Sequence, residues 1–600
     1  MPAPGNAAVG QPTVPRRFAA TVATRGDWVA LRTKASDDSW IELTWNDVAE
    51  QATRVAGGLA AIGVGRGDRV MLLMRNRPEF HVLDIAVQLV GATPISIYNS
   101  SSASQIEYLV GHSGARTAIV EDAGFLNRFL EVRKNLTALR DLFVLEYEQA
   151  YPEGVRPYAE LLSGDPVDLR PASEIVQPED LATVIYTSGT TGPPKGVQIT
   201  HANVCWTVDS ILEAFELDPQ GKRIVSYLPM AHIAERMVSH YQAITFANNV
   251  TTCPDTGKIV QYLGAVRPEI FFGVPRVFEK AAATIGALVG ADPEKAAAFQ
   301  AALALSNDVD ARRRAGEAIP DELFAEWERT DAEQLAPWRS ILGLDACISA
   351  ASGAAPLSPG TMLFFRGLGV PLSEIYGLSE TCGPLTWAAF AVKPGTVGPA
   401  IPGAEIRLDT DGEVLARGGN IFAGYLNAPD KTAEVFTEDG WFRTGDIGVI
   451  DDDGYLAIVD RKKELIITAG GKNISPANLE SALKGASPVI GQACVIGDAR
   501  PFIAALIVLD PEVAPVWASA HGIADTSTAA LAVEPTVVAE VQRAIDSVNA
   551  NVSQVEAIRK FTVLPDEWQP DSVELTPTMK LKRRGINERY QQQIEALYNK

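Results

Sequence analysis

Hydroxyl groups, glycines and a single lysine are concentrated between Thr187 and Gly196, directly after the apolar run 182–186. Such a loop at the end of a strand suits a polyphosphate, because glycine lets backbone N–H groups approach closely and hydroxyls can donate hydrogen bonds. It is not a Walker A loop, which needs Gly-Lys-Ser/Thr, because Pro194 precedes Lys195. We therefore predict a phosphate-binding loop, with a surface turn as the alternative.

Three shorter segments further along the chain carry groups that a nucleotide could use. Residues 352–356 are small enough to let a flat ring approach the backbone. Residues 376–381 supply a ring for stacking, two hydroxyls and one anionic metal ligand. Residues 441–446 end in Asp446, whose carboxylate can accept hydrogen bonds from both hydroxyls of a ribose. Taken alone, each segment is also typical of a loop without chemistry.

The elements that must position these groups begin with a regular alternation in the first 120 residues. Thr44 and Asp47 predict a capping box at the start of a helix with one apolar face. The elements that follow are expected as strands at 70–74, 95–98 and 117–120, alternating with helices at 78–89 and 105–110. This order predicts an α/β protein with doubly wound sheets in a large N-terminal domain.

Two later regions differ in composition from this pattern. Residues 279–338 are rich in Ala, Glu, Asp and Arg, so we predict helices there, as a surface insertion. After residue 460, Ser475-Pro476 predicts a helix start. Strands are expected there at 465–467, 493–496 and 504–508. We therefore predict a large domain over residues 1–460 and a small α+β domain over residues 461–600, joined by a hinge at 461–463.

The charge of the chain excludes some classes of partner. The 600 residues carry a net charge of −22, with −21 in residues 1–460 and −1 in residues 461–600. Such an acidic chain argues against a protein whose main partner is nucleic acid, because neutralising phosphates needs a basic face. General attraction to anionic lipid is disfavoured for the same reason.

Five widely separated cysteines predict neither a disulfide framework nor a zinc site. The proline-rich N-terminal segment lacks the apolar core of a signal peptide. The longest uncharged stretches contain proline, Ser and Thr, so none is expected to be a transmembrane helix. We expect buried free thiols in a reducing compartment and a cytoplasmic protein. Peripheral membrane contact and the oligomeric state stay open.

Together and in this order, the segments resemble the AMP-forming acyl-adenylate superfamily of acyl-CoA synthetases, luciferases and nonribosomal adenylation domains. The resemblance extends from about Thr44 to Arg584. Residues 227–236, 273–280 and 575–583 resemble the long-chain fatty-acid–CoA ligase branch more specifically. Met579 stands where the superfamily usually has glycine, a departure that is itself usual in this branch.

The resemblance implies that the large domain binds ATP and Mg²⁺. Glu380 matches the family's metal-binding glutamate, and Thr187 offers a second oxygen near the metal. Tyr376 is expected to stack on adenine, and Asp446 to hold the ribose with help from Arg461. The full set of expected ATP- and AMP-binding residues is Thr187, Ser188, Gly189, Thr190, Thr191, Gly192, Lys195, Ser352, Gly353, Ala354, Tyr376, Gly377, Ser379, Thr381, Asp446 and Arg461.

Two further catalytic residues are implied besides Glu380 and Thr187. Lys580 matches the lysine that bridges the substrate carboxylate and the α-phosphate, two anions whose repulsion must be neutralised. Its alternative reading is a solvated lysine in the basic run 580–584. His232 matches a motif between the acyl site and the nucleotide, where it gates or orients the carboxylate; a hydrogen-bonded core histidine is the alternative.

In the second step the thiol of CoA attacks the acyl-adenylate and expels AMP, so no enzyme nucleophile is required. The resemblance implies that the small domain rotates between the two steps. Lys463 matches the hinge position, and Gly470, Gly471 and Lys472 match a loop that faces the pantetheine channel. An ordinary solvated linker charge is the alternative for Lys463.

We therefore expect an ATP- and Mg²⁺-dependent ligase that converts a long-chain fatty acid to acyl-AMP and then to acyl-CoA. A fatty acyl-AMP ligase that serves a carrier protein is the nearest alternative, but such enzymes usually carry an insertion that hinders rotation. No insertion is evident in the 66 positions from Glu380 to Asp446. A carboxylic acid reductase is disfavoured because the sequence ends at Lys600. A non-catalytic nucleotide-binding sensor, the alternative from another class, is disfavoured because competent residues occupy every expected position.

Overall fold

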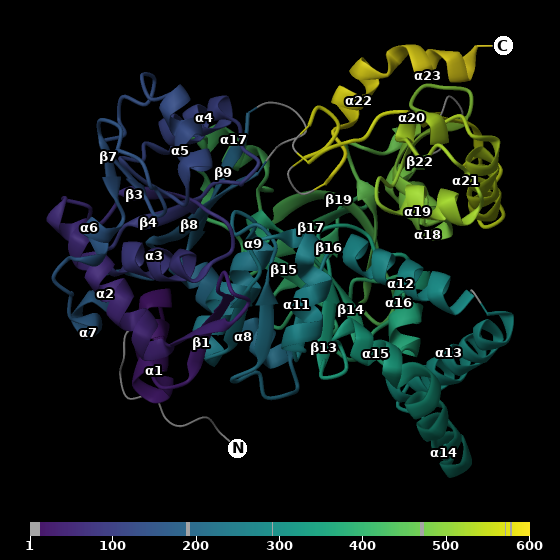
Figure 1. Ribbon diagram of the computed structural model, residues 1–600, viewed down its shortest axis with the longest axis horizontal. Coiled ribbons are helices and arrows are strands. Elements are labelled where there is room, and N and C mark those ends of the chain that lie inside the picture. The colour runs from purple at the N-terminus through teal and green to yellow at the C-terminus, as the bar shows by residue number, and fades with distance from the viewer. Residues whose placement is uncertain are drawn as a thin grey trace.

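A large N-terminal part and a smaller C-terminal part make up the fold, with the small part (green to yellow) lying above one end of the large part (Figure 1). This computed structural model describes residues 12–187, 193–290, 292–467, 473–570, 572–576 and 579–599. The fold class is mixed α/β, as predicted.

The first sheet confirms the expected alternation of strands and helices. Its five strands are all parallel, in the order β4-β3-β5-β6-β7, so the order reverses between β3 and β5 as in a doubly wound sheet. Thr44 caps α2, and the capping box with Asp47 is present. The elements of this region are α1 (Val14–Arg25), α2 (Trp45–Ala61), β3 (Arg69–Leu73), α3 (Pro78–Leu89), β4 (Thr93–Ser96), α4 (Ala103–Ser113), β5 (Thr117–Val120), α5 (Ala123–Glu131), β6 (Asp141–Val144), β7 (Val155–Pro157), α6 (Ala159–Leu162) and α7 (Leu169–Ser173).

Two further sheets each combine three parallel strands with one antiparallel edge strand. The first has the order β10-β11-β1-β2 and consists of β1 (Val29–Lys34), β2 (Trp40–Thr44), β10 (Arg223–Ser226) and β11 (Asn249–Thr252). The second has the order β12-β13-β14-β15 and consists of β12 (Ile270–Gly273), β13 (Ser349–Ser352), β14 (Leu372–Leu378) and β15 (Gly383–Trp387). Their connecting helices are α8 (His201–Ala214), α9 (Ile233–Glu235), the π-helix η1 (Arg236–Gln242), α10 (Ala243–Phe246), η2 (Thr256–Lys258), α11 (Ile259–Val266), α16 (Pro359–Gly367) and η4 (Ser379–Thr381).

Antiparallel strands complete the large part; of these, only β8, the apolar run before the loop at 187–196, was expected from the sequence. A four-stranded sheet has the order β16-β17-β19-β20, and a three-stranded sheet has the order β18-β9-β8. The strands are β8 (Leu181–Thr187), β9 (Lys195–Thr200), β16 (Glu405–Leu408), β17 (Glu413–Arg417), β18 (Gly424–Tyr425), β19 (Phe442–Ile450) and β20 (Leu456–Arg461), with α17 (Pro429–Glu434) between β18 and β19.

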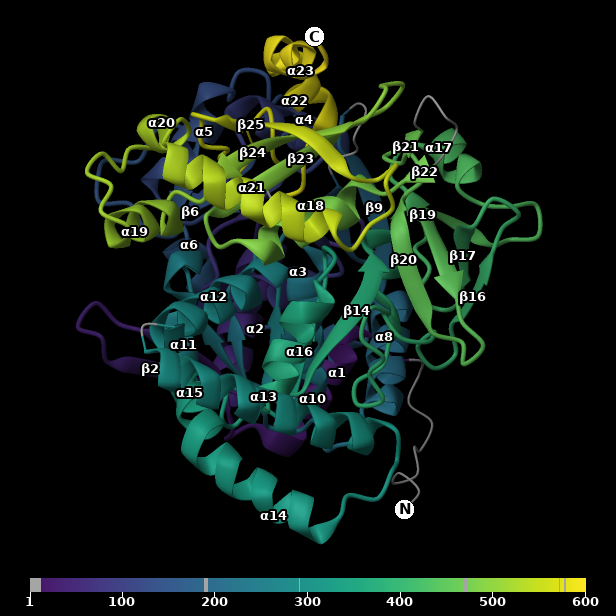
Figure 2. The ribbon, with the colours of Figure 1, turned by 90° about the vertical axis from the view of Figure 1, so that its right-hand side faces the viewer.

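The region from 279 to 338 is helical, as predicted. Helix α14 lies at the foot of the molecule, away from the sheets (Figure 2), whereas the long helix α13 packs against α16. No residue of α14 is buried, which agrees with a surface insertion. The helices are α12 (Pro275–Gly290), α13 (Pro293–Arg314), α14 (Asp321–Thr330), η3 (Asp331–Leu335) and α15 (Ala336–Leu342).

The small part has its own three-stranded sheet, β23-β24-β25, and its own core. Among the described residues, no hydrophobic core cluster combines residues from both sides of position 460. Ser475 caps the expected helix at its start. The elements are β21 (Ile466–Ile467), β22 (Asn473–Ile474), α18 (Pro476–Ala486), β23 (Ile490–Ile496), β24 (Ile503–Leu509), α19 (Val513–Ala520), α20 (Thr528–Leu531), α21 (Pro535–Asn549), β25 (Ile558–Leu564), α22 (Arg583–Arg589) and α23 (Gln591–Tyr598).

Within the described ranges, none of the helices combines the length and the apolar character needed to cross a lipid bilayer.

Candidate active site

A cavity of about 3010 Å³ lies where the two parts meet, and both parts contribute to its wall. It brings together most of the described residues that we singled out from the sequence. These are Thr187, Lys195, His232, Ala354, Tyr376, Gly377, Ser379, Glu380, Asp446, Arg461, Lys463 and Lys580.

Three other expected residues lie behind the cavity wall. The Ser352 side chain is fully buried at the end of β13. Gly353 is required by close packing, because a Cβ there would lie 2.8 Å from the carbonyl oxygen of Ile375. The Thr381 hydroxyl closes its own turn by donating to the Gly383 carbonyl at 2.6 Å. These residues therefore shape the wall instead of reaching into the cavity.

Some expected residues lie outside the described part of the chain. They are Ser188, Gly189, Thr190, Thr191 and Gly192 of the loop expected to bind phosphate, and Gly470, Gly471 and Lys472 of the loop expected to face CoA.

A carboxylate, a phenol and a guanidinium meet on one wall of the cavity. The Tyr376 hydroxyl on β14 donates to Asp446 Oδ2 at 2.6 Å, and Arg461 Nε lies 3.7 Å from Asp446 Oδ1. The last contact follows from strand register, since Asp446 on β19 stands opposite Arg461 on β20. Burial raises the pKa of the Asp446 carboxyl, and the Arg461 guanidinium opposes that shift. The arrangement presents a fixed acceptor beside an aromatic ring.

A second carboxylate lies near Thr187 and Lys195, the two described ends of the loop expected to bind phosphate. The Tyr425 hydroxyl donates to Glu380 Oε1 at 2.8 Å, and the Lys195 ammonium lies 4.5 Å from the centre of the Tyr425 ring. Thr187 stands opposite Lys195 in the β8–β9 pair, so both ends of the loop lie close to Glu380 and Tyr425. A carboxylate, a hydroxyl and an ammonium are therefore grouped at one end of the cavity.

The two ends of this loop are fixed by a pair of tyrosines. The Tyr108 hydroxyl donates to the Pro194 carbonyl at 2.9 Å. The Tyr186 hydroxyl lies 2.9 Å from Nδ1 of His112, whose ring stacks on Tyr108. Helix α4, which carries both Tyr108 and His112, therefore links the strand before the loop to Pro194 at the loop's far end.

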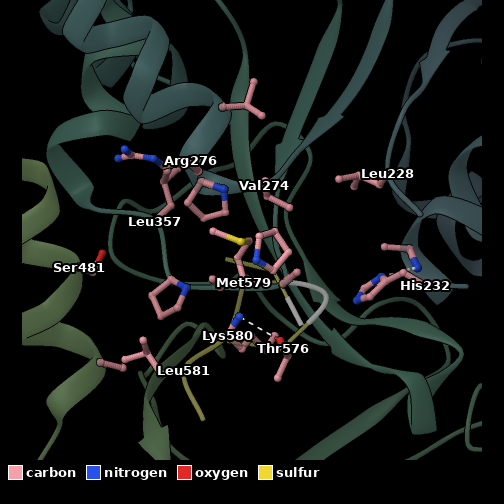
Figure 3. Close-up of a pocket in the computed structure, with 18 of the residues that line it drawn as sticks. Leu228, His232, Val274, Arg276, Leu357, Ser481, Thr576, Met579, Lys580 and Leu581 are labelled. Atoms are coloured by element: carbon pink, nitrogen blue, oxygen red, sulfur yellow. Dashed lines mark hydrogen bonds between the residues drawn. The ribbon is translucent and has the colours of Figure 1, made fainter. Parts of the chain in front are cut away.

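Lys580 enters the cavity from the small part. Figure 3 shows it close to Thr576, with His232 and Leu228 on another wall. Its backbone N–H donates to the Thr576 hydroxyl at 3.0 Å, and the Thr576 N–H donates to the Lys580 carbonyl at 2.8 Å. Burial, followed by the charge of Arg461, lowers the pKa of the Lys580 ammonium to about 8. The carboxylates of Asp446, Glu464 and Glu380 oppose this shift.

Met579, directly before this lysine, adopts φ +63°, in the left-handed region that favours glycine. This conformation gives a physical reason for the glycine that the superfamily usually has at this position. For a methionine, this left-handed backbone conformation costs on the order of 1 kcal/mol.

His232 is half-buried in the cavity wall, and its protonation is set by its surroundings. Burial, followed by the charge of Lys580, lowers the pKa of His232 to about 4, so the imidazole is neutral. The Ala234 backbone N–H donates to Nδ1 at 3.2 Å, which leaves the ring proton on Nε2. The side chain is therefore a hydrogen-bond donor at Nε2 and caps a short helix with its other nitrogen.

The segment that carries His232 is held by Arg236, a fully buried residue at the start of η1. Arg236 NH1 pairs with Asp84 on α3 at 2.7 Å, and Nε donates to the Met230 carbonyl at 3.1 Å. A π-helix at such a place is typical of a functional region. The sequence motif contained Arg236, but its partner Asp84 lies more than 150 positions away and could not be identified.

Other contacts were also missed. Tyr425, the partner of Glu380, belongs to no segment that we singled out. Two ion pairs join α12 to the small part, namely Arg276 with Asp510 and Lys280 with Glu512 at 2.6 Å. Both basic residues belong to the segment 273–280 noted in the sequence. No motif in the sequence marked their acidic partners, Asp510 and Glu512, as interface residues.

All five cysteines are free, as expected, and four of them are buried. Burial raises the pKa of each thiol, to about 11 for Cys205 and about 12 for Cys253, Cys347, Cys382 and Cys494.

The sequence matches two family models that together cover nearly the whole chain. The AMP-binding enzyme model matches residues 18–426, and the AMP-binding enzyme C-terminal domain model matches residues 463–600.

Curated proteins include relatives that match over most of their length. The chain is 39% identical over 577 residues to the long-chain-fatty-acid--CoA ligase FadD15 of Mycobacterium tuberculosis, covering 94% of this chain and 93% of that protein. It is 31% identical over 633 residues to the long-chain-fatty-acid--CoA ligase ACSBG2 of Xenopus laevis, covering 98% of this chain and 84% of that protein.

Solved structures share the fold at lower sequence identity. The A domain of a carboxylic acid reductase from Segniliparus rugosus, in complex with AMP and a co-purified carboxylic acid, matches with a TM-score of 0.74 and 21% identity, covering 98% of this chain and 94% of that one. The anthranilate CoA ligase AuaEII, in complex with anthranoyl-AMP, matches with a TM-score of 0.73 and 18% identity, covering 97% and 98%.

Proposed function

Since the chain belongs to the AMP-binding enzyme family, we propose that it activates a long-chain fatty acid with ATP and transfers the acyl group to CoA. The observation that carries the proposal is the entry of Lys580 into the cavity lined by Tyr376, Glu380 and Asp446. The names of the relatives support the fatty acid as substrate and CoA as acceptor.

The nucleotide would lie against the wall formed by β14, β19 and β20. Asp446 offers a fixed carboxylate to the ribose hydroxyls, and Tyr376 offers its ring to adenine. Arg461, whose Nε lies 3.7 Å from Asp446 Oδ1, would assist at the ribose. Thr187 and Lys195 flank the loop that would hold the pyrophosphate.

The residues around Glu380 fit a magnesium ion. Mg²⁺ prefers oxygen ligands, and in phosphate-transfer sites it is bound through one or two carboxylates together with the substrate phosphates. Glu380 supplies one carboxylate, and the Thr187 hydroxyl is a second oxygen on the same wall. When bound, the ion would neutralise charge on the phosphates.

In the first step, a carboxylate oxygen of the fatty acid attacks the α-phosphorus of ATP. The bond from that phosphorus to its bridging oxygen breaks, and pyrophosphate leaves. Lys580 would neutralise both anions as they approach. His232 would orient the substrate carboxylate by donating a hydrogen bond to it from Nε2. The acyl chain would lie in the apolar part of the cavity, beside Leu228 and Val274 (Figure 3).

In the second step, the thiol of CoA attacks the acyl carbonyl and AMP leaves with the electron pair of the mixed anhydride bond. We propose residues 1–460 and 461–600 as the two domains, with Lys463 at the hinge. Separate hydrophobic cores support this boundary, since a domain with its own core can rotate as a unit.

The proposed role of Lys580 predicts a characteristic pH dependence. Its ammonium is needed for adenylation, and its pKa is about 8, so it is protonated below pH 8 and loses its proton above that value. We expect kcat/KM for pyrophosphate release, measured at limiting ATP, to fall as pH rises through about 8 and to approach a tenfold loss per pH unit. His232, with a pKa of about 4, should add no inflection between about pH 5 and 8.

Lys580→Arg is the matched variant for this profile. Because guanidinium keeps its proton, the falling limb should move to higher pH even if the variant is slower. A wild-type profile that stays flat to about pH 10 would contradict the assignment.

The function itself is tested by incubating the purified protein with palmitate, ATP, Mg²⁺ and CoA. We expect palmitoyl-CoA, AMP and pyrophosphate in equal amounts, and no acyl-CoA without ATP. Pyrophosphate without palmitoyl-CoA would favour an acyl-AMP ligase that serves a carrier protein. Neither product, over a series of acids of increasing chain length, would favour a nucleotide-binding sensor.

A further inference from the structure

The contact between α12 and the small part contains an arginine, Arg276, that makes a close ion pair with one acidic residue while a second, buried one lies beside it on the same helix. Arg276 lies in the first turn of α12, in the large part. Its guanidinium NH2 pairs with Oδ2 of Asp510, which follows β24 in the small part. This ion pair therefore exists only while the small part is docked as it is in this structure.

Asp510 is held rigidly for this contact. Its side chain is 4% exposed, and its other oxygen, Oδ1, accepts the backbone N–H groups of Glu512 at 3.0 Å and Val513 at 2.9 Å. A carboxylate fixed in this way has little freedom to follow Arg276 if the two parts separate.

Glu279 is the second acidic neighbour, and it lies on the same helix as Arg276. Its side chain is only 6% exposed, and its nearest approach to Arg276 is 3.8 Å, from Oε2 to NH1. In the described part of the chain, neither of its carboxylate oxygens accepts a hydrogen bond. A buried carboxylate without donors is costly, and natural structures seldom keep one without a reason.

We propose that Arg276 is a positioning residue that exchanges acidic partners between the two half-reactions. It pairs with Asp510 while Lys580 is in the cavity, and it pairs with Glu279 after the small domain rotates away. The inference rests on the proposed two-step function. It explains why Glu279 is buried without donors in this orientation, because its donor is engaged with Asp510.

The exchange lowers the cost of rotation. Separating the domains would otherwise leave a partly buried guanidinium without a counter-charge, and an uncompensated buried charge is strongly destabilising. Glu279, three residues further along the same helix, moves with Arg276 and is available in every orientation. The two carboxylates therefore favour opposite orientations through one shared arginine.

The second ion pair of this interface provides a control. Lys280 and Glu512 are 39% and 76% exposed, and an ion pair between exposed side chains contributes little. Glu512→Gln should change either half-reaction by less than about twofold.

The test measures each half-reaction separately in the full-length protein. Adenylation is followed by fatty-acid-dependent exchange of pyrophosphate into ATP, and thioester formation by conversion of supplied acyl-AMP with CoA. Asp510→Asn should slow adenylation about tenfold and leave thioester formation unchanged or faster. Glu279→Gln should do the reverse, slowing thioester formation about tenfold while adenylation is kept.

A structural readout distinguishes this switch from a merely structural role. Cysteines introduced by Lys280→Cys and Glu512→Cys can be joined by a short bismaleimide only in the docked orientation. The cross-linked fraction should fall when Asp510→Asn is added and rise when Glu279→Gln is added. Variants that carry only one of the two introduced cysteines measure the background, including any reaction of the five native thiols, and Asp510→Glu should restore the wild-type fraction.

Opposite shifts in both readouts would support the exchange. Equal loss of both half-reactions in the two variants, or unchanged cross-linking, would overturn it. Wild-type protein that makes no acyl-CoA from any acid would instead count against the proposed function. Should Asp510→Asn not fold, Glu279→Gln alone decides, because the exchange requires its cross-linked fraction to rise.

Discussion

Replacing Lys580 with alanine is expected to slow acyl-adenylate formation by about 10²- to 10³-fold, the usual effect of removing one preorganised electrostatic group. The ammonium lies in a cavity where burial already lowers its pKa to about 8, so water replaces it poorly. Conversion of supplied acyl-AMP to acyl-CoA should stay within about twofold of wild type, because that step needs no cation between two anions. Pyrophosphate exchange and thioester formation measure the two effects separately.

Arg584→Ala is the matched control for this variant. Arg584 belongs to the same basic run, but its side chain is 79% exposed and pairs with Glu588 on its own helix. Adenylation should be nearly unchanged in this control. Equal loss of both half-reactions in Lys580→Ala would contradict the proposed rotation, because the lysine would then act in both orientations.

The second large effect is expected for Glu380→Gln, which removes the charge and keeps the shape. Adenylation should fall by about 10²-fold, and the Mg²⁺ concentration needed for half-maximal rate should rise, since the carboxylate is the proposed metal ligand. The Tyr425 hydroxyl can still donate to the amide oxygen, so the local structure should be kept. Initial rates over a magnesium titration measure both changes.

Glu405→Gln serves as the control, because Glu405, on β16, is exposed and pairs with Arg417 on β17. It should leave the magnesium dependence unchanged. A Glu380→Gln enzyme with a normal magnesium dependence and a merely lower rate would indicate that Glu380 supports the wall without binding the ion.

Local elements were predictable from the sequence because their signals are local. The capping box of Thr44 and Asp47 spans four residues, and Ser475 before Pro476 marks the start of α18. The parallel sheet around β3 followed from short apolar runs separated by helices. The segments expected to bind the nucleotide stood out because each carries several unusual residues in one short stretch.

Contacts between distant residues were not predictable in the same way. Asp446 meets Tyr376 across 70 positions and Arg461 through the register of an antiparallel pair. Strand pairing of this kind depends on packing between elements. Such packing produces no periodic pattern of residues in a single sequence. The same reason explains why the sheet of β16, β17, β19 and β20 was missed.

The buried charged residues show most clearly what could not be predicted from the sequence. Arg236 reads as one more charge after an apolar segment, yet it is fully buried and paired with Asp84. Glu279 likewise reads as a solvated helix residue, although its side chain is 6% exposed. Burial of a charge is decided by a partner elsewhere in the chain, so only the folded structure identifies it.

The burial of the cysteines has a chemical consequence for a protein with this proposed activity. An acyl-adenylate is a mixed anhydride that acylates any thiolate it can reach. With thiol pKa values of about 11 to 12, only about one thiol in 10⁴ or 10⁵ of the protein's own is ionised at pH 7. The chain can therefore hold a reactive acyl donor without labelling itself, and the acyl group is kept for the thiol that arrives from solution.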